Sequence, residues 1–257
     1  KTNNLDMNII TYNVLPTTMK SGLIEIVPDS ETLYNIKEKN NYSIQNYILE
    51  NNANFSVEEI RNRFIKSTAV YSVITYLLGI GDRHMDNIMV TKDGRLFHID
   101  YSFVLGLDPR ALAPKIRITS EMIDAFGGVN SNYYKSFEDY CSQSYNVLRR
   151  HANLFTNLLY LLTKIDNSKF TMEQLEIEIA KRFLPGEYRS QAKIQLIKTI
   201  NNSKSAYNFT DFIHRQYKES LCLDNWRSLD LYEKANSIIS YINPITYITH
   251  PTQPKTI

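Results

Sequence analysis

The chain has 257 residues, 43% of them hydrophobic, and a formal net charge of +2 at pH 7. This length suits one large domain or two lobes, and the hydrophobic content is that of a globular protein with a sizeable core. So small a charge gives no support to nucleic acid as a partner. The longest apolar stretches are interrupted by polar residues and are shorter than the roughly 20 apolar residues that span a bilayer. The two cysteines, Cys141 and Cys222, fit no metal-binding spacing, so we expect reduced thiols in a cytoplasmic protein.

Residues 5–27 are predicted to form short strands, with a turn at residues 19–22. The sequence Pro28-Asp29-Ser30 is expected to end the last strand and to cap a helix that starts at about Glu31. A second short helix is predicted over residues 44–49, inside a polar segment. We therefore expect a start rich in strands, followed by helices.

A long buried helix is predicted next. Ser56 and Glu59 have the spacing of a capping box, in which each side chain accepts the backbone N–H of the other residue. From there the apolar residues keep helical spacing as far as Leu78. Gly79 and Gly81 are expected to end the helix, which then leads into a polar loop.

Asp93-Gly94 lies between two apolar runs and is the strongest short-range signal for a β-hairpin, because a tight primed turn needs residues that tolerate positive φ. If these two residues form the turn, the register of the strands is fixed. The expected pairs are Lys92 with Arg95, Val90 with Phe97, Ile88 with Ile99 and Asn87 with Asp100. Facing residues on antiparallel strands lie roughly 4.5–5.5 Å apart. The sequence therefore predicts an amide and a carboxylate side by side at the open end of the hairpin.

The remainder of the chain is predicted to be mainly helical. Residues 107–119 show no periodicity and contain two prolines, which predicts a mobile loop. The expected helices cover residues 120–125, 131–150, 152–164, 172–183, 187–203 and 206–217. Thr171 and Gln174 have capping spacing at the start of one of them. One more helical stretch, residues 229–242, is expected in a C-terminal tail.

Asp82, Asn87 and Asp100 are the candidate catalytic and metal-binding residues. Asn and Asp at strand ends often only satisfy turn amides, so the hairpin alone indicates no chemistry. Asp82, however, precedes Asn87 by five residues. The base Asp and the metal-binding Asn of the protein-kinase catalytic loop have this spacing, and a second metal-binding Asp follows one hairpin later. Carboxylate and amide oxygens are hard ligands that Mg²⁺ accepts beside phosphate oxygens.

The motif Gly-Asp-Arg-His-Met-Asp-Asn-Ile-Met at residues 81–89, followed by Phe-His-Ile-Asp at 97–100, resembles the phosphatidylinositol 3-/4-kinase superfamily. In that superfamily Asp-Arg-His replaces the protein-kinase order His-Arg-Asp. The resemblance runs from about Leu5 to about Ser220 and is closest to the class III phosphatidylinositol 3-kinases. Three further segments resemble the start and the end of their activation loop and a following helix. These are residues 105–109, 121–128 and 148–154.

The resemblance implies a role for each residue of the loop. Asp82 matches the catalytic-loop acid, and His84 matches the histidine proposed as base or charge stabiliser for the inositol hydroxyl. Asn87 and Asp100 match two ligands of Mg²⁺ or Mn²⁺. Arg83 is expected to be structural, bound to a nearby carboxylate or to loop carbonyls.

Residues 22–27 resemble the hinge that binds the adenine of ATP in this superfamily. The carbonyl of Glu25 and the amide of Val27 would meet the adenine edge. The residues that match the apolar lining of the adenine site are Ile24, Met89 and Ile99. In the expected hairpin register Met89 and Ile99 lie on opposite faces, so twist or an offset register must bring both to the ring.

Two features depart from the family pattern. The usual Asp-Phe-Gly is here Asp100-Tyr101-Ser102, which keeps the metal ligand but removes the backbone freedom of glycine. Family members also have a strand lysine for the α-phosphate and a phosphate-covering loop before the hinge, and no such strand precedes Gly22 here. We therefore expect a partial kinase domain that lacks most of the N-terminal lobe. A catalytically dead, partner-binding pseudokinase is one alternative.

Arg110, Lys115 and Arg117 lie in the loop that family members use to read the inositol head group. Isolated basic residues usually form a solvated face, but their position predicts contact with the substrate. Class I enzymes, which take multiply phosphorylated lipids, have a denser basic cluster in this loop. The sparse pattern therefore favours plain phosphatidylinositol.

The resemblance implies an α+β fold, in which a few N-terminal strands precede the mostly helical C-terminal lobe of a protein-kinase-like lipid kinase. The expected parts are the hinge region at 1–30, the C-lobe at 31–220 with catalytic loop 81–89 and activation loop 101–122, and a tail at 221–257. The expected activity is transfer of the ATP γ-phosphate to an inositol hydroxyl, with the 3-position favoured. We expect peripheral contact with membranes that hold phosphatidylinositol, and a regulatory protein subunit. A related protein Ser/Thr kinase is the second alternative.

Overall fold

The structure is a computed structural model that describes residues 6–18, 21–39, 43–52, 55–109, 113–165 and 171–203. The chain divides into two compact units, residues 1–208 and 209–257, and every described residue lies in the first. The predicted helices over 206–217 and 229–242 lie outside the described residues. The lobe boundaries that the sequence predicted after residues 30 and 220 stay predictions.

Two short strands, β1 (Val14–Pro16) and β2 (Gly22–Ile24), form an antiparallel two-stranded sheet near the N-terminus. Glu25 ties the base of this hairpin: its N–H donates to the carbonyl of Asn13 at 2.9 Å, and its Oε2 accepts the N–H of Asn13 at 2.8 Å. The predicted strands are confirmed, and their large apolar side chains face solvent. These side chains are those of Val14, Leu15, Leu23 and Ile24.

The second sheet has the strand order β3 (Ser30–Thr32), β4 (Ile88–Thr91) and β5 (Leu96–His98), and both neighbouring pairs are antiparallel. β4 and β5 form the predicted hairpin, but the predicted register is wrong by one residue. The observed pairs are Ile88 with His98, Met89 with Phe97 and Val90 with Leu96.

The register differs because the turn holds three residues instead of two. The N–H of Thr91 donates to the carbonyl of Arg95 at 2.9 Å, so residues 92–94 make the turn. Gly94 takes φ +88°, whereas Asp93 does not adopt a positive φ, which is the pattern of a three-residue loop with a glycine bulge. The hydroxyl of Thr91 favours this loop, because it donates to the Asp93 carboxylate at 2.5 Å and accepts the N–H of Arg95 at 3.0 Å.

The first predicted helix begins two residues later than expected. Glu31 belongs to β3, which pairs with β4, so the helix α1 (Leu33–Glu38) is capped by Thr32. The hydroxyl of Thr32 accepts a backbone N–H of the first turn at 3.1 Å. The helix α2 (Ile44–Glu50) follows and confirms the predicted short helix.

The predicted long helix is confirmed as α3 (Val57–Leu78). Its N-terminus has the expected capping box, in which the N–H of Glu59 donates to Ser56 Oγ at 3.2 Å and the N–H of Ser56 donates to Glu59 Oε2 at 3.1 Å. At the other end Gly79 takes φ +59° and ends the helix in the left-handed conformation that glycine adopts without strain.

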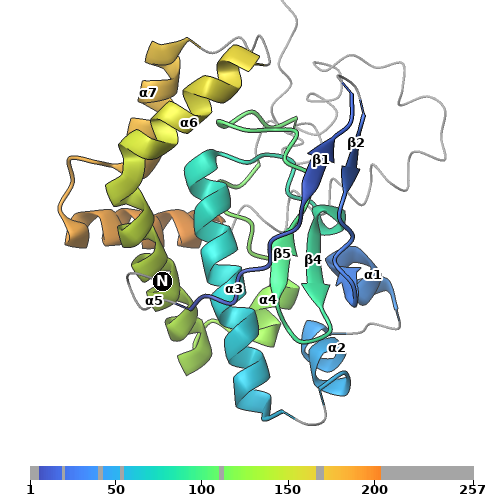
Figure 1. Cartoon of the computed structure of the whole chain (residues 1–257). Helices are drawn as coiled ribbons and strands as arrows, with labels where there is room; N and C mark the ends of the chain where they lie inside the picture. Colours follow the sequence, from blue (N-terminus) through green and yellow to red (C-terminus); the bar gives the residue numbers. More distant parts are fainter. Residues whose placement is uncertain are drawn as a thin grey trace, which may run out of the picture. The chain divides into compact units, whose positions relative to one another are not determined.

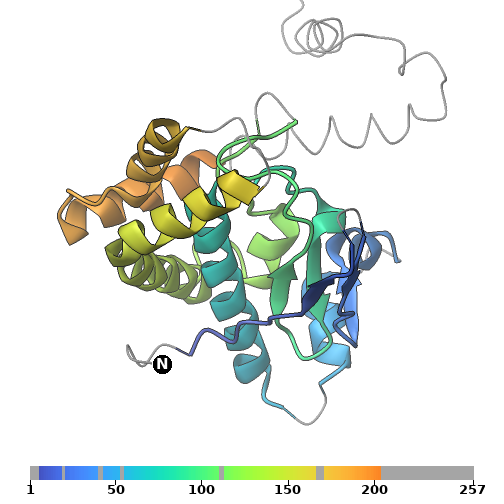
Figure 2. The same ribbon diagram turned by 45° about the horizontal axis from the view of Figure 1, so that its top comes forward.

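The remaining described elements are helical. They are the single turn η1 (Met85–Asn87), the helices α4 (Ser120–Ala125) and α5 (Asn132–Leu148), the turn η2 (Arg149–His151), and the helices α6 (Ala152–Ile165) and α7 (Met172–Phe183). A further helix covers residues 189–203. Each predicted helix that falls within the described residues starts within two residues of its expected start. Figures 1 and 2 show α3 in the middle, with the sheet, α1 and α2 on one side and α5, α6 and α7 on the other.

The buried Arg149 fixes the end of α7. Its Nε donates to the carbonyl of Phe183 at 3.1 Å, and its Nη2 donates to the carbonyls of Leu184 and Glu187, the latter at 2.8 Å. A cation at a helix C-terminus also interacts favourably with the helix dipole. The segment at 148–154, which resembles a family motif, therefore contains a structural arginine that joins two helices.

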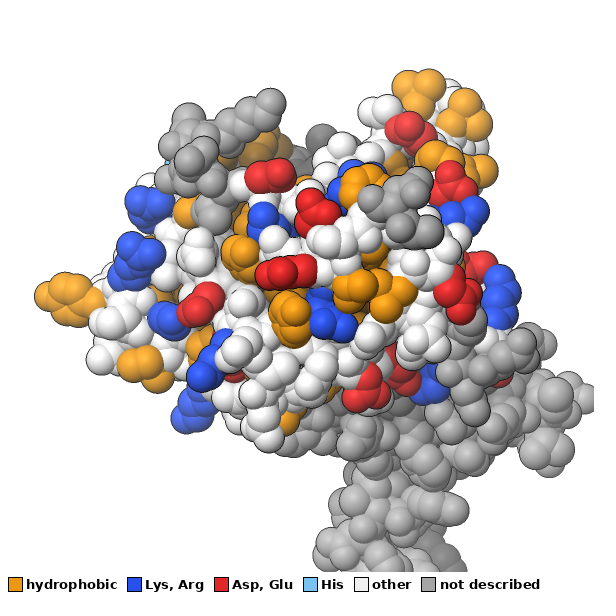
Figure 3. Space-filling view, turned by 90° about the horizontal axis from the view of Figure 1, so that it is seen from below, with side chains coloured by type: hydrophobic (Ala, Val, Ile, Leu, Met, Phe, Trp, Pro, Cys, Tyr) orange, Lys and Arg blue, Asp and Glu red, His pale blue; other side chains and the backbone are white. Residues whose placement is uncertain are grey.

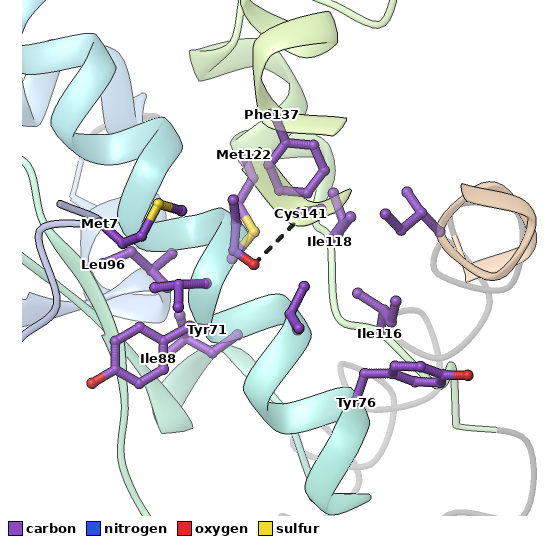
Figure 4. Close-up of a cluster of buried hydrophobic side chains, with 14 of the residues drawn as sticks. Met7, Tyr71, Tyr76, Ile88, Leu96, Ile116, Ile118, Met122, Phe137 and Cys141 are labelled. Carbon is purple, nitrogen blue, oxygen red and sulfur yellow. Dashed lines mark hydrogen bonds between the residues drawn. The ribbon is translucent and has the colours of Figure 1, made fainter. Parts of the chain in front are cut away.

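The core forms around α3. Figure 4 shows apolar side chains from the N-terminal segment, α3, the β4–β5 hairpin, the segment at 116–118, α4 and α5 converging on one cluster, with the thiol of Cys141 donating to the carbonyl of Ala69 at 3.7 Å. Phe64 is 0% exposed and lies 5.6 Å from Phe126, measured between ring centroids. Full burial of one large apolar side chain contributes about 1.5–3 kcal/mol, so this cluster holds the site's supporting elements together.

The surface carries both signs of charge. Figure 3 shows acidic and basic side chains interspersed on the face that it views, as expected for a net charge of +2. Among the residues that the structure describes, no helix combines the length and the apolar character needed to cross a membrane.

We predict that Phe64→Ala lowers the free energy of unfolding by about 3–5 kcal/mol, because it removes a fully buried ring and leaves a cavity. Urea unfolding followed by circular dichroism measures the change. Ile177→Ala is the control, because Ile177 is 47% exposed and its truncation creates no internal cavity. A loss below 1 kcal/mol in Phe64→Ala would contradict the proposed packing.

Candidate active site

Arg83 joins the loop after α3 to the end of β5. It is 5% exposed, and its guanidinium donates to three carbonyls: Nε to Gly81 at 2.8 Å, Nη1 to Ile99 at 2.7 Å, and Nη2 to Asp100. The prediction that Arg83 is structural and bound to loop carbonyls is confirmed. One buried cation therefore sets the spacing between the segment that contains Asp82 and the segment that contains Asp100.

Asn87 makes the second connection across the loop. Its Nδ2 donates to the carbonyl of Asp82 at 3.0 Å, and its own carbonyl accepts the N–H of Ile99 at 3.1 Å. Asn87 therefore faces Ile99, and the predicted direct opposition of Asn87 and Asp100 is wrong by the same single residue as the hairpin register. The amide nitrogen of Asn87 is a hydrogen-bond donor only, so Oδ1 is the atom through which Asn87 could bind a cation.

Asp82 and Asp100 both adopt left-handed backbone conformations, with φ of +53° and +56°. Non-glycine residues rarely adopt such angles, and Asp is among those that tolerate them best. Residues held in this region cluster at functional sites, where the surrounding contacts over-determine them. The contacts of Arg83 and Asn87 supply that constraint here.

His84 lies between the carboxylates of Asp82 and Asp86. Its Nε2 is 3.7 Å from Asp82 Oδ2, and its Nδ1 accepts the backbone N–H of Asp86 at 3.2 Å. Because Nδ1 accepts this bond, Nε2 is the ring nitrogen that carries a proton, and it faces Asp82. The structure thus brings the two predicted catalytic residues, Asp82 and His84, together.

Asp100 is exposed and is held by Ser102. The Ser102 hydroxyl donates to Asp100 Oδ1 at 2.5 Å, and the Ser102 N–H donates to the same atom at 3.1 Å. The Ser102 hydroxyl, and to a smaller extent the charges of Arg83 and His84, keep the pKa of the Asp100 carboxyl below its usual range. The serine that replaces the family's glycine therefore contacts the predicted metal ligand directly.

His98 packs inside the protein, as expected. It is 2% exposed, and its ring stacks on Tyr71 with 5.4 Å between centroids. Burial, together with the charges of Arg83 and Arg117, lowers the pKa of His98 to about 3, so the ring is neutral at physiological pH. Its carbonyl accepts the hydroxyl of Tyr12 at 3.3 Å. A neutral, stacked histidine in the core is a structural residue.

The predicted adenine-site residues divide into two groups. Met89 and Ile99 are half-buried, and the observed register places both on one face of the hairpin, which removes the conflict in the predicted register. Ile24 is 68% exposed on the β1–β2 hairpin, Glu25 binds Asn13 as described above, and Val27 is half-buried.

The three predicted head-group residues differ in their placement. Arg110 lies outside the described residues. Lys115 is exposed, whereas Arg117 is 3% exposed and close enough to His98 to lower its pKa. The structure therefore presents Lys115 at the surface and places Arg117 in the interior.

The spacing of residues in the sequence did not predict two of the polar contacts in the structure. The N–H of Asp82 donates to Asp108 Oδ2 at 2.8 Å, and Lys37 of α1 forms an ion pair with Glu121 of α4. Asp108 belongs to a segment that resembles the start of the activation loop, but neither its type nor its spacing indicates this bond. In the described part of the chain, no three or more His, Cys, Asp and Glu side chains are grouped closely enough to hold a metal ion by themselves.

A mostly helical lobe that carries an Asp82–Asn87 loop and a downstream Asp100 defines a kinase-like catalytic domain. Residues 1–168 match the family model described as phosphatidylinositol 3- and 4-kinase. This match covers more than half of the 257 residues, and the chain belongs to that family. The resemblance inferred from the motifs is confirmed.

Several curated proteins are similar to the chain. Phosphatidylinositol 3-kinase pik3 of Schizosaccharomyces pombe is 36% identical over 227 residues, which make up 84% of this chain and 28% of that protein. Phosphatidylinositol 3-kinase VPS34 of Arabidopsis thaliana is 42% identical over 165 residues, 63% of this chain and 20% of that protein. The VPS34 of Saccharomyces cerevisiae is 35% identical over 213 residues, 80% of this chain and 24% of that protein. The chain thus spans less than a third of the length of these relatives.

We predict that Arg83→Met lowers the free energy of unfolding by roughly 3 kcal/mol or more, because each carbonyl left without a donor costs about 1–3 kcal/mol. Urea unfolding measures the loss. Arg83→Lys keeps the positive charge but not the several planar N–H donors of the guanidinium. Its free energy of unfolding is expected to lie between those of the wild type and Arg83→Met. A stability of Arg83→Met within 1 kcal/mol of the wild type would contradict the role assigned to the guanidinium.

The ion pair between Lys37 and Glu121 predicts a pH dependence of stability. Burial raises the pKa of Glu121. The hydrogen bond and the charge of Lys37 lower it by more than burial raises it, so the net shift is downward. A carboxyl with a depressed folded-state pKa stabilises the fold above its unfolded pKa of about 4.3, and the contribution is lost as pH falls through the folded pKa. Glu121→Gln should therefore flatten the fall in melting temperature below about pH 4.5.

Thermal melts across pH 3–6 would check this. Glu176→Gln, on an exposed part of α7, removes the same charge at the protein surface and serves as the control. Identical acid slopes for the wild type and Glu121→Gln would show that the pair does not contribute.

Proposed function

We propose that this chain is the catalytic part of a lipid kinase that transfers the γ-phosphate of ATP to the 3-hydroxyl of phosphatidylinositol. The names of its relatives support the reaction and the 3-position, since all three proteins described above are phosphatidylinositol 3-kinases. The observation that carries the proposal is the bonded set of Asp82, Arg83, Asn87 and Asp100, which holds two carboxylates and an amide beside one loop.

Asp82 is the proposed acceptor of the hydroxyl proton. Nδ1 of His84 accepts the N–H of Asp86 and its Nε2 faces Asp82, so Asp82 rather than His84 is the proposed acceptor. In the reaction, the inositol oxygen forms a bond to the γ-phosphorus, the bond from that phosphorus to the β–γ bridging oxygen breaks, and the hydroxyl proton passes to Asp82. His84 stays positioned to stabilise the negative charge that develops beside it.

Asn87 and Asp100 are the proposed ligands of Mg²⁺ or Mn²⁺. Their oxygens are the hard donors that such ions prefer, and the low pKa of Asp100 keeps its carboxylate ionised. A divalent ion bound there would neutralise the charge of the ATP phosphates. Ser102 occupies one oxygen of Asp100, which leaves Oδ2 for a cation.

ATP and lipid are proposed to enter from the surface formed by the hinge and the hairpin. The half-buried Met89 and Ile99 would contact the adenine, with Ile24 and the backbone of Glu25 and Val27 completing its site. Lys115 is the proposed head-group contact among the described residues, because it is exposed and Arg117 is buried. Peripheral membrane contact, a regulatory subunit and a cytoplasmic location stay predictions.

We predict that the purified protein transfers labelled phosphate from Mg·ATP to phosphatidylinositol vesicles, and that chromatography of the deacylated product places it on the 3-hydroxyl. Asp82→Asn should lower kcat by about 10²–10⁴-fold, as expected for loss of a general base. Asp100→Ala should weaken Mg·ATP binding by about tenfold or more in calorimetry, which corresponds to at least about 1.4 kcal/mol.

Asp139→Asn is the matched control, since Asp139 lies on α5 in an exposed ion pair with Lys193. It should leave both quantities unchanged. Transfer to a protein substrate with none to lipid, or equal binding of Mg·ATP by the wild type and Asp100→Ala, would refute the proposal.

A further inference from the structure

The segment after β5 returns to the end of α3 and is bonded along it. Three backbone hydrogen bonds join the two segments: the N–H of Gly81 donates to Phe103 at 2.9 Å, the N–H of Leu105 to Leu78 at 2.9 Å, and the N–H of Gly106 to Gly79 at 2.8 Å. A fourth bond uses a side chain, because the N–H of Asp82 donates to Asp108 Oδ2 at 2.8 Å. Residues 103–108, here called the return segment, therefore lie against the candidate catalytic loop.

The approach of the two segments is close enough to require glycine. A Cβ added at Gly81 would lie 2.1 Å from the carbonyl oxygen of Leu107 and 3.0 Å from the Cα of Asp108. Both are backbone atoms, which cannot move aside as a flexible side chain can. The return segment is thus in direct contact with the loop, one residue before Asp82.

Both backbone polar groups of Asp82 are held by side chains from elsewhere in the sequence. Its N–H is bound by Asp108, and its carbonyl is bound by Nδ2 of Asn87 at 3.0 Å. These two bonds orient the peptide groups on either side of its Cα and so fix its φ of +53°. That left-handed angle directs the Asp82 side chain, and without such contacts a non-glycine residue leaves this region.

Helix α7 supports the return segment from the other side. Arg182 lies against the glycines of the contact, because a Cβ at Gly106 would be 2.4 Å from its Nη2 and a Cβ at Gly79 would be 3.0 Å from its Cζ. Glu178 holds the guanidinium with a 2.5 Å contact between its Oε2 and Arg182 Nη1. The return segment is therefore packed between the catalytic loop and a helix that begins more than 60 residues later in the sequence.

We propose that Asp108 is a positioning residue for the reaction: its carboxylate, held in place by the return segment, orients the backbone of Asp82 and with it the carboxylate that accepts the hydroxyl proton. The part concerning catalysis rests on the proposed function, because it assumes the role of Asp82.

Amide hydrogen exchange tests the contact without any assumption about activity. In Asp108→Ala the Asp82 N–H loses its acceptor, and its exchange rate should rise about tenfold or more. Asp108→Asn retains a side-chain oxygen that accepts the bond, so it should keep most of the protection. The control Asp139→Ala should leave exchange at Asp82 unchanged. Unchanged exchange at Asp82 in Asp108→Ala, with the fold intact by thermal melting, would overturn the proposal.

Lipid kinase kinetics test the consequence. Asp108→Ala should lower kcat by about 10–100-fold, with the KM for ATP within about twofold of the wild type, because a misplaced acid slows the chemical step without changing nucleotide contacts. Asp108→Asn should recover most of kcat. If Asp108→Asn is as slow as Asp108→Ala although both melt like the wild type, the positioning role is refuted. If the wild type has no lipid kinase activity, the proposed function is refuted instead. The hydrogen-exchange result would still show whether Asp108 holds the Asp82 N–H.

Discussion

The site depends on one buried guanidinium. Arg83 donates to carbonyls on two segments of chain that the intervening hairpin separates, and it thereby fixes the position of Asp100 relative to Asp82. A buried charge needs such donors and acceptors to offset its desolvation, so the arginine and the backbone around it have few alternative arrangements. Its charge also contributes to the low pKa of Asp100 and to the low pKa of His98. A single side chain thus fixes the spacing of the candidate site and also contributes to its electrostatics.

The hairpin shows where local sequence signals are sufficient and where they are not. Asp93-Gly94 correctly located the turn, but the turn has three residues because the hydroxyl of Thr91 bonds within it and only Gly94 takes a positive φ. A shift of one residue moves every side chain to the other face of a strand. The shift therefore decides that Met89 and Ile99 share a face and that Asn87 faces Ile99. The type of this turn depends on the contacts of the Thr91 side chain, which the Asp93-Gly94 pair alone does not reveal.

Most of the helices could be predicted, because capping residues and apolar spacing are local properties, as in Ser56, Glu59 and the helix that follows them. The motif also indicated Asp82, His84, Asn87 and Asp100, whose proximity the structure bears out through their shared contacts. Contacts between distant segments could not be predicted in this way. The bond from Asp82 to Asp108 and the burial of Arg117 depend on how the chain returns to α3, which no spacing encodes. The role of Ser102 was also unexpected: the sequence indicated lost flexibility, whereas the hydroxyl binds Asp100.

The hairpin of β1 and β2 has a practical consequence for anyone who produces this chain. A ribbon of two strands is only marginally stable by itself, and strand edges lined with apolar side chains readily pair with another copy. Leu23 and Ile24 are about two-thirds exposed there, beside Val14 and Leu15. Concentrated solutions should therefore self-associate through this ribbon, and a charged residue in place of Leu23 would improve solubility while leaving the loop after α3 intact.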